Sequence, residues 1–414
     1  MLKKRRRSNP WRVIVLILLV CGALYINQVV VPATPPLFIP TPTPTRSPES
    51  YVADAENMLA EGRISPAIDA YYEAIRADPR NASNYIVLSR LLIYSAKYDE
   101  AIENAANALL INPNNSMALA LQGWAMGFRG EFFDAETVLK KAITADPNNY
   151  AAYAYLAEVY ALQVQAGEDD LTTLDKAVEA SRTAMDLNQN ALETLRARGV
   201  VLELTGNYEE AAVQFEAAIN QNPNIADLHL ALGRNYRYLT LYDKAVEEFN
   251  RANALNPSDP LPDTYISRTY LTVGEISKAI QYAEQALKDD PTDPYMYGNL
   301  GTMYYRNEQY NEAIKYFRIG IQGGLSEDGQ VVEGLPLDAG RISEYYQLFG
   351  LSLARNAACG DAIQIAQILK EGQPDDEYAV YNADEMINIC QGFVDNPPTP
   401  SPTILFLPSS TPQP

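Results

Sequence analysis

Apolar residues recur at helical spacing along most of the chain, and the pattern is clearest over residues 192–225. The apolar face is interrupted at residues 205–207, which read Thr-Gly-Asn, and it ends at residues 222–224, which read Asn-Pro-Asn. Gly and Asn favour tight turns, and Pro ends a helix. This stretch therefore predicts two helices joined by a short turn.

The residues within this unit divide into small and bulky ones. Small residues would let the two antiparallel helices approach closely, and bulky residues would fill the space between this pair and the next. The small residues are Gly199, Ala211 and Ala218, and the bulky residues are Leu202, Tyr208 and Phe215. One hairpin cannot bury both of its faces, so the pattern requires stacked neighbours.

Copies of the unit follow one another, and most are 34 residues apart. An alanine marks each copy, at positions 67, 101, 135, 177, 211, 245, 279, 313 and 362. A second position is small in every copy: Ala55, Ser89, Gly123, Ala157, Gly199, Gly233, Ser267, Gly301 and Gly350. Over residues 49–374 the spacing resembles the tetratricopeptide repeat. The resemblance implies an all-α solenoid of about nine helical hairpins, wound as a right-handed superhelix.

Two copies depart from the regular spacing. Extra residues fall near 163–174, in a turn, and a Gly-rich, acidic insertion occupies residues 323–342. The second insertion is either an exposed connection without function or a bend or partner-contact loop, and no strand is expected in the chain. After the last copy, residues 375–393 predict a capping helix that covers the open end of the array.

The N-terminal region differs from the repeats. Residues 1–12 are basic, and residues 13–31 are apolar and long enough for a transmembrane helix. Positive charge stays on the cytoplasmic side, so the N-terminus is expected in the cytoplasm and the repeats outside it, at the cell membrane. One alternative is a cleaved signal peptide, although no small-residue cleavage site is evident. The other is lipidation at Cys21, although Val20 is large for such a site.

Composition limits the classes of partner. The Pro/Thr-rich residues 32–48 predict a semi-rigid linker, and residues 394–414 predict a disordered tail. The formal net charge is -20, and without residues 1–12, which carry six basic side chains and no acidic one, it is -26. An acidic region argues against nucleic acid and against anionic lipid head groups. Membrane contact is therefore expected only through the N-terminal helix.

The sequence offers no candidate catalytic site. The one histidine, His229, stands at a repeat position that calls for a packing residue, and the three cysteines are scattered. Zinc sites and Ser-His-Asp or Cys-His sets need more converging side chains than these. The repeats also leave no room for a separate catalytic domain. We therefore expect a core histidine, no metal, no cofactor and no enzymatic activity.

In tetratricopeptide proteins the first helices line a concave groove that contacts a partner, and the resemblance carries this role to matching positions here. They are Arg90, Tyr94, Trp124, Phe128, Glu158, Arg196, Glu203, Arg234, Arg237, Tyr238, Arg268, Tyr305 and Arg306. Arg and aromatic residues are typical of binding hot spots. The family's carboxylate-clamp pattern is absent, because Val52 and Glu56 occupy its positions. The alternative is that the arginines pair with acidic residues on adjacent helices.

These features predict a membrane-anchored, extracytoplasmic scaffold, of bacterial origin, that binds a partner protein or peptide in the groove. The alternative function is a permanent structural subunit of an envelope machine for secretion, pilus assembly or polysaccharide export. An enzyme with an unrecognised site belongs to a third class, which the missing catalytic side chains disfavour. Neither the partner nor the oligomeric state follows from the sequence.

The last expectation is a disulfide between Cys359 and Cys390. Gly350 and Ala362 place Cys359 at the start of the second helix of the ninth repeat. A capping helix antiparallel to that helix would bring its own end, with Cys390, beside Cys359. A location outside the cytoplasm permits oxidation. The alternative is two separately buried thiols.

Overall fold

The computed structural model describes residues 9–30, 46–167 and 172–395. The chain divides into two units, residues 1–47 and residues 48–414, and each is considered by itself. The first unit contains helix α1 (Pro10–Tyr25), followed by a π-helical turn, η1 (Ile26–Val30). Together they include a 19-residue apolar helical stretch, Pro10–Gln28, which is long enough to cross a membrane and would equally suit a signal sequence. The basic positions 3–7 lie outside the described residues.

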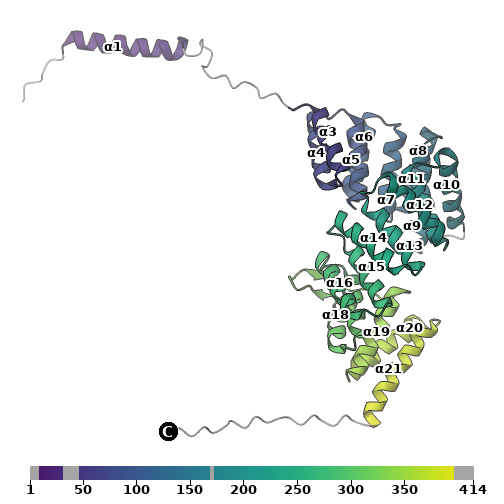
Figure 1. Ribbon diagram of the computed structural model, residues 1–414. Coiled ribbons are helices and arrows are strands. Elements are labelled where there is room, and N and C mark those ends of the chain that lie inside the picture. The colour runs from purple at the N-terminus through teal and green to yellow at the C-terminus, as the bar shows by residue number, and fades with distance from the viewer. Residues whose placement is uncertain (1–8, 31–45, 168–171, 396–414) are drawn as a thin grey trace, which may run out of the picture. The chain divides into compact units, whose positions relative to one another are not determined.

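The second unit is built from helices arranged in antiparallel pairs (Figure 1). Within its described residues there are nine consecutive pairs and a final helix, α21 (Glu377–Asp395). The pairs are α3 (Pro48–Ala60) with α4 (Ile64–Ala77), α5 (Ala82–Tyr94) with α6 (Tyr98–Ile111), α7 (Ser116–Phe128) with α8 (Phe132–Ala145), α9 (Tyr150–Gln165) with α10 (Thr173–Asn188), α11 (Leu192–Leu204) with α12 (Tyr208–Gln221), α13 (Ala226–Tyr238) with α14 (Tyr242–Leu255), α15 (Pro260–Thr272) with α16 (Ile276–Asp289), α17 (Pro294–Arg306) with α18 (Tyr310–Gln322), and α19 (Arg341–Arg355) with α20 (Cys359–Gly372). The predicted all-α array of helical hairpins is confirmed.

Close packing inside each pair explains the small residues of the repeat. A Cβ atom added to Gly199 would lie 2.8 Å from the ring of Phe215, which is too close for any larger residue there. The alanines Ala211 and Ala218 are fully buried beside the same ring. A small residue on one helix therefore faces a large residue on the other. A larger residue at the small position would clash, and a smaller residue at the large position would leave a cavity.

The turn inside each pair needs one residue with a positive φ angle. Glycine takes this position in the turns at Gly62, Gly130, Gly167, Gly206 and Gly274. Four other turns place a residue with a Cβ there: Ala96, Thr240, Glu308 and Ala357, with φ between 56° and 61°. A Cβ makes this conformation unfavourable, so these four turns are strained relative to the glycine turns.

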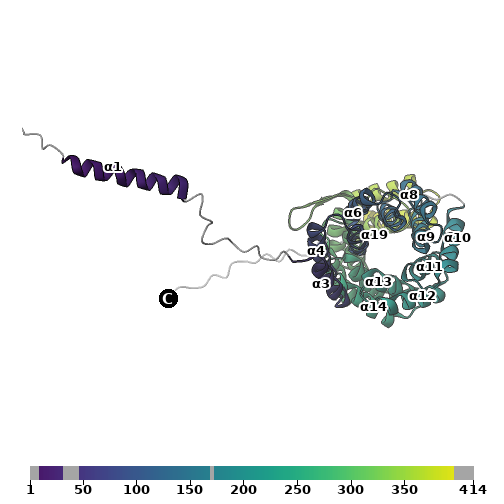
Figure 2. The same cartoon turned by 90° about the horizontal axis from the view of Figure 1, so that it is seen from above.

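The first helix of each pair faces the inside of the array. In Figure 2, α9, α11, α13 and α19 lie around the centre, while α10, α12 and α14 lie at the periphery. The surface formed by the first helices α5, α7, α9, α11, α13, α15, α17 and α19 is called the inner surface below. The predicted partner-contact residues all come from these helices.

The array also touches itself across one turn of the superhelix. The side-chain amide of Asn224 donates a 3.0 Å hydrogen bond to the carbonyl oxygen of Leu59, 165 residues earlier in the chain. Arg90 Nη1 lies 3.6 Å from Glu193 Oε1, which comes from a helix three repeats away. In a simple solenoid each repeat contacts only its neighbours. This array is therefore also closed by contacts between repeats far apart in the sequence.

The two insertions have different structures. The first lengthens α9 to 16 residues and continues through residues 168–171, which lie outside the described residues. The second contains a short antiparallel hairpin of β1 (Gly324–Leu325) and β2 (Val331–Val332). The expectation that the chain has no strand was therefore wrong. The Asp328-Gly329 turn, with φ of 83° at Gly329, lets the flanking apolar residues pair, and Asp-Gly is the short-range sequence signal for such a hairpin.

Part of the second insertion packs against the array. Val332 and Leu335 are buried, and the hydroxyl of Tyr346 donates a 2.9 Å hydrogen bond to the carbonyl oxygen of Leu335. Leu325 and Val331 face each other across the hairpin and are exposed. The connection is thus neither a simple exposed loop nor a break in the array.

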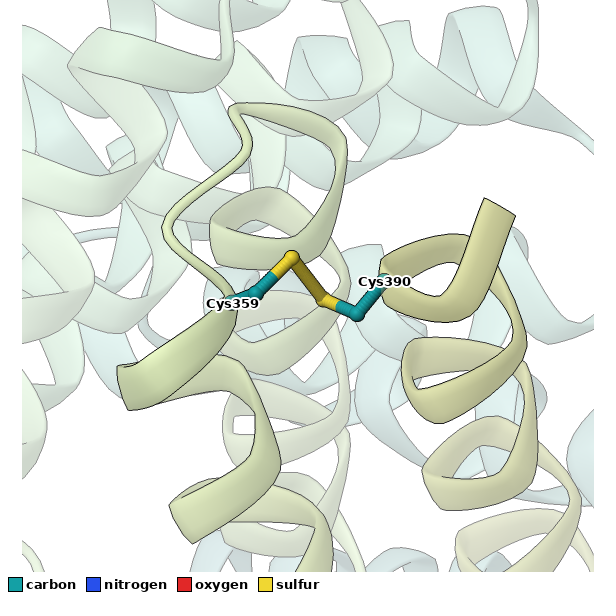
Figure 3. Close-up of a disulfide and its surroundings, with 2 residues drawn as sticks. All are labelled: Cys359 and Cys390. Atoms are coloured by element: carbon teal, nitrogen blue, oxygen red, sulfur yellow. A yellow bond between two sulfur atoms is a disulfide. The ribbon is translucent and has the colours of Figure 1, made fainter. Parts of the chain in front are cut away.

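The final helix caps the array and is joined to it by a disulfide. α21 packs against α19 and α20, with Ala379, Ala383 and Met386 fully buried. Tyr378, near the start of α21, is 80% exposed, because it lies on the outer face of the helix. The Cα atoms of Cys359 and Cys390 are 5.5 Å apart, and their sulfur atoms are bonded, as predicted (Figure 3).

Candidate protein-binding surface

A buried charge network occupies the inner surface at α7, α9, α11 and α13. Arg196 is 5% exposed, and its Nε atom donates 3.1 Å hydrogen bonds to both carboxylate oxygens of Glu158. Its Nη2 atom lies 2.5 Å from Asp227 Oδ2. Trp124 Nε1 donates a 2.9 Å hydrogen bond to Glu158, and the guanidinium lies 4.9 Å from the Trp124 ring. One arginine is therefore balanced by two carboxylates and an aromatic face.

The surroundings raise the pKa values of both Glu158 and Arg196. Burial raises the pKa of Glu158, and this effect exceeds the lowering caused by Arg196 and by the hydrogen bond from Trp124. Burial opposes the charge of Arg196, but Asp227 and Glu158 together raise its pKa above the usual value. The pair is thus stable because each buried charge has a partner, and removing one member would leave the other unpaired.

Trp124 belongs to the core of the array. It is fully buried, and its ring stacks on Tyr155 with centroids 4.2 Å apart. The sequence placed Trp124 and Arg196 at partner-contact positions, whereas the structure gives both of them contacts within the protein. For Arg196, the alternative of pairing with acidic residues on adjacent helices is the one observed.

The residues predicted in α5 and α7 also contact other parts of the array. Arg90 reaches Glu193, as described above, and its Nε atom is buried without an acceptor among the described residues. Tyr94 meets Trp124 edge to face at 6.0 Å. Phe128 stacks on Tyr98 with centroids 4.9 Å apart, and both rings remain partly exposed.

Arg234 is paired in the same manner as Arg196. Its Nε and Nη2 atoms donate hydrogen bonds of 2.8 and 3.0 Å to the two carboxylate oxygens of Glu203. Near it on α13, Tyr238 is 54% exposed and stacks on Tyr208 with centroids 4.4 Å apart. Tyr238 therefore offers an aromatic face to a partner, while the charge of Arg234 is already compensated.

Arg268 has a different environment. Its Nε atom donates a 3.0 Å hydrogen bond to Asn299 Oδ1, and its Nη2 atom lies 3.4 Å from the hydroxyl of Tyr345. No ion pair to a carboxylate is formed by this guanidinium within the described part of the chain. Burial lowers the pKa of Arg268, and the nearby positive charge of Arg341 acts in the same direction. Arg268 is thus a partly buried charge with neutral partners.

The remaining predicted residues lie at the ends of α13 and α17. Arg237 is partly exposed, and its Nε atom is buried without an acceptor among the described residues. Arg306 is exposed, with its guanidinium 6.0 Å from the Tyr305 ring. Tyr305 is nearly buried and is also covered by the Arg355 guanidinium at 5.4 Å. Arg237 and Arg306 therefore have charge available for an external acceptor.

A pocket of about 560 Å³ opens on the inner surface beside the network. Glu158, Arg196, Glu203, Asp227 and Arg234 contribute its charged groups. A second hollow of about 300 Å³ shares Tyr98, Phe128, Arg196, Asp227 and other residues with it and adds Asp259. The two hollows share part of their lining, which is charged, aromatic and apolar, and together they are called the depression below.

Sequence reasoning did not select three acidic and aromatic residues of this depression: Asp227, Asp259 and Tyr98. Asp227 lies on the first helix α13, where the resemblance places partner contacts, so its charge is a usable signal. Asp259 immediately precedes α15, and Tyr98 begins a second helix. Neither lies on a first helix, so the repeat pattern alone gave no reason to choose them.

The structure places His229 in the core. The side chain is 3% exposed, and its two ring nitrogens lie 2.6 Å from Glu248 Oε2 and 2.9 Å from the carbonyl oxygen of Pro223. The prediction of a core histidine is confirmed. No group of three or more His, Cys, Asp and Glu side chains that could hold a metal ion is found among the described residues.

Comparisons with known proteins agree with the fold. A family model described as tetratricopeptide repeat matches residues 197–260 and 266–324. A TPR repeat-containing protein of Methanocaldococcus jannaschii is 28% identical over 179 residues, which are 43% of this chain and 30% of that protein. Human tetratricopeptide repeat protein 6 is 31% identical over 143 residues, which are 34% of this chain and 26% of that protein. The chain spans less than a third of the length of either relative.

A solved structure extends the likeness to most of the array. The crystal structure of the APC/C hetero-tetramer Cut9-Hcn1 contains a chain that superposes with a TM-score of 0.63 and 14% sequence identity. The match covers 82% of this chain and 63% of that chain. At this identity the similarity concerns the fold alone.

Proposed function

Because the chain is a tetratricopeptide repeat protein, we propose that it is a membrane-anchored scaffold whose inner surface binds a segment of another protein. The observation that carries the proposal is the set of arginines on this surface without carboxylate partners among the described residues. These are Arg237, Arg268 and Arg306. Exposed Tyr238 lies on the same surface. Arginine with tyrosine is the composition of binding hot spots.

The expected partner segment carries an acidic side chain or a C-terminal carboxylate. A guanidinium held against Asn299 and Tyr345 has lost water without gaining a negative charge, and this loss is unfavourable. A carboxylate that reaches Arg268 supplies that charge and can bind bidentately. The binding energy would therefore come from compensation of a charge that is already in place.

The anchor is the apolar stretch Pro10–Gln28. Five basic residues at positions 3–7 favour a cytoplasmic N-terminus and a repeat array outside the cytoplasm, in a bacterial envelope. The disulfide between Cys359 and Cys390 supports this location, because disulfides persist in oxidising compartments. A reporter that is active only in the cytoplasm should be silent when it is fused after residue 414. Activity of that fusion would reverse the proposed orientation.

The binding proposal is tested by capture from membranes solubilised in mild detergent, with mass spectrometry of the captured proteins. Replacing Arg237, Arg268 and Arg306 with Ala should weaken capture of a specific partner by more than ~2 kcal/mol and change the melting temperature little, because none of the three forms an ion pair to a carboxylate among the described residues. Arg251→Ala is the matched control, because Arg251 lies on the peripheral helix α14 and pairs with Glu247. Lower stability with unchanged capture would instead assign the arginines a packing role.

The second candidate function is a permanent subunit of an envelope machine. The capped and disulfide-linked C-terminal end favours a durable structural part. The same purification separates the two functions. Partners that co-purify in fixed stoichiometry support the machine, and a free monomer supports transient binding.

A further inference from the structure

The depression on the inner surface has more acidic than basic groups. Its charged lining consists of Glu158, Glu203, Asp227 and Asp259 against Arg196 and Arg234. Arg234 is bound to Glu203, and Arg196 is shared between Glu158 and Asp227. Asp259 forms no ion pair in the described part of the chain. The arginines therefore leave about two negative charges uncompensated in a confined space, where charges interact more strongly than in water.

The negative charges of Asp227 and Asp259 are the least compensated in the depression, because Asp227 shares Arg196 with Glu158 and Asp259 has no ion pair among the described residues. The side chain of Asp227 is 43% exposed, so it reaches the open part of the depression. Asp259 precedes α15, and its Oδ1 atom accepts a 2.9 Å hydrogen bond from the backbone N–H of Leu261. Burial raises the pKa of Asp259, and the charge of Asp227 raises it further. The charge of Asp227 thus disfavours ionisation of Asp259 until a cation lies nearby.

The remaining lining suits the stem and the head of a long basic side chain. Tyr98 and Phe128 form a stacked pair with centroids 4.9 Å apart, and Tyr265 and Tyr238 add further rings. A cation over such rings is attracted by their π-electrons. Leu228, Leu230 and other aliphatic side chains offer an apolar wall for methylene groups.

We propose that this depression, lined by Tyr98, Phe128, Asp227 and Asp259, binds a lysine or arginine side chain of the partner segment. The inference rests on the proposed function, and it adds a recognition element of opposite charge to the arginines of the same surface. The ammonium or guanidinium head lies between the two aspartates, and the aliphatic stem lies against the leucines. The net negative charge of the chain outside residues 1–12 would also attract a basic segment at long range.

The proposal is tested with the full chain in non-ionic detergent on an array of immobilised 12-residue peptides of random sequence. Peptides with Lys or Arg should bind about tenfold more strongly than the same peptides with Gln, as expected for a charge-assisted contact. Asp227→Asn with Asp259→Asn should reduce this preference below about twofold. Both changes preserve shape, and Asn at position 259 can still cap α15.

Two further variants make the outcomes distinguishable. Asp134→Asn with Asp243→Asn removes the same charge from the first turns of the peripheral helices α8 and α14, and it should leave the preference unchanged. Arg268→Ala should weaken binding of acidic peptides and keep the preference for Lys or Arg. If the unaltered chain binds peptides without preferring Lys or Arg, the proposed pocket is wrong but the proposed function stands. The same holds if the preference persists in the variant with Asp227→Asn and Asp259→Asn. Binding of no peptide by the unaltered chain overturns the pocket and the proposed function together.

Discussion

Two regions of the inner surface treat an arginine in opposite ways. In the first region, formed by α7, α9, α11 and α13, Arg196 is almost fully buried and is held by Glu158 and Asp227. In the second region, formed by α15, α17 and α19, the guanidinium of Arg268 has hydrogen-bond partners among the described residues only in the neutral groups of Asn299 and Tyr345. The charge of Arg196 is therefore compensated within the protein, and the charge of Arg268 is compensated only when something else supplies a negative charge.

The difference shows that position in a repeat does not determine the role of a side chain. Both arginines occupy positions where tetratricopeptide proteins contact partners. Glu158 is 38 residues from Arg196, and Asp227 comes from the helix pair that follows it. The carboxylates arrive from neighbouring repeats, so only the folded array reveals which arginine is compensated. An arginine with its own carboxylates stabilises the fold, and one without them is available for binding.

The sharpest test of the comparison replaces each arginine with leucine. Arg196→Leu should lower the free energy of unfolding by about 3–5 kcal/mol, because Glu158 would remain buried without its partner. Arg268→Leu should change it by less than about 1 kcal/mol, because no carboxylate is left unpaired. Chemical denaturation monitored by circular dichroism would give both values. Equal losses for the two variants would remove the distinction between the regions.

A second test asks what else stabilises the second region. Its outer end is covered by α21, which the Cys359–Cys390 disulfide ties to α20. Closing this loop, with its sequence separation of 31, should contribute about 3.7 kcal/mol in the chain-entropy model. Replacing both cysteines with serine should therefore increase hydrogen exchange in α19, α20 and α21 far more than in α7 and α9.

Thiol counting on denatured, non-reduced protein is the control for that experiment. One free thiol, from Cys21, is expected. Three free thiols would show that the bond is not formed in the cell. They would also weaken the case for an extracytoplasmic array.

A buried carboxyl group in α15, that of Asp263, makes the stability of the second region depend on pH. Behind the inner surface of α15, Asp263 is 1% exposed, and its pKa is raised to about 6 by burial first and by Asp289 second. Its Oδ1 atom accepts a 2.9 Å hydrogen bond from Asn253, whereas Oδ2 has no donor among the described residues. The folded state binds this proton more tightly than the unfolded state, for which a pKa of about 3.9 applies. The protonated Asp263 carboxyl group therefore contributes its full stabilisation to the folded state below about pH 4, and this contribution is lost as the pH rises through about 6.

Asp263→Asn should therefore stabilise the array by about 2 kcal/mol at pH 7.5 and by little at pH 4.5. Asparagine keeps the shape and the contact with Asn253, and it avoids placing a charge beside Asp289. Melting curves of both proteins across this pH range would measure the difference. A pH-independent difference would show that the carboxyl group does not titrate as described.

The smallest predicted effect concerns the turns. Non-glycine residues take the positive φ angle in two of the three turns of the second region, at Glu308 and Ala357, and in one of the four turns of the first region, at Thr240. Thr240→Gly should raise the free energy of unfolding by about 1 kcal/mol, because the β-branched side chain disfavours φ of 61°. The reciprocal change Gly206→Thr should lower it by a similar amount. A decrease in stability with Thr240→Gly would mean that the threonine side chain contributes more than its strain costs.

The fold was predictable because the repeat combines several local signals. Helical periodicity, a small residue such as Gly199, and a helix-ending proline such as Pro223 recur together. Each signal is weak, but their repetition at a fixed spacing admits few other architectures. The cysteine pair followed from the same logic, because the repeat positions placed both helix ends at one edge of the array.

The candidate surface was only partly predictable. The repeat positions identified the helices that face inward, including those of Arg268 and Tyr238. They did not reveal that Trp124 is fully buried or that Arg90 reaches Glu193 three repeats away. Those contacts depend on the curvature of the superhelix, which sums small rotations between many repeats. A pattern within one repeat carries no information about that sum.

The contact between Asn224 and Leu59 has a mechanical consequence. A chain pulled from its N-terminal side would receive the force at Pro48, where α3 begins, and Leu59 lies near the other end of the same helix. The hydrogen bond across the superhelical turn and the Arg90–Glu193 pair contribute about 1 kcal/mol each, which is less than the packing that holds a repeat together. These two contacts would break first under force. The superhelix would then lengthen while its helices stay intact. The closed turn would thus lengthen reversibly under force before any repeat unfolds.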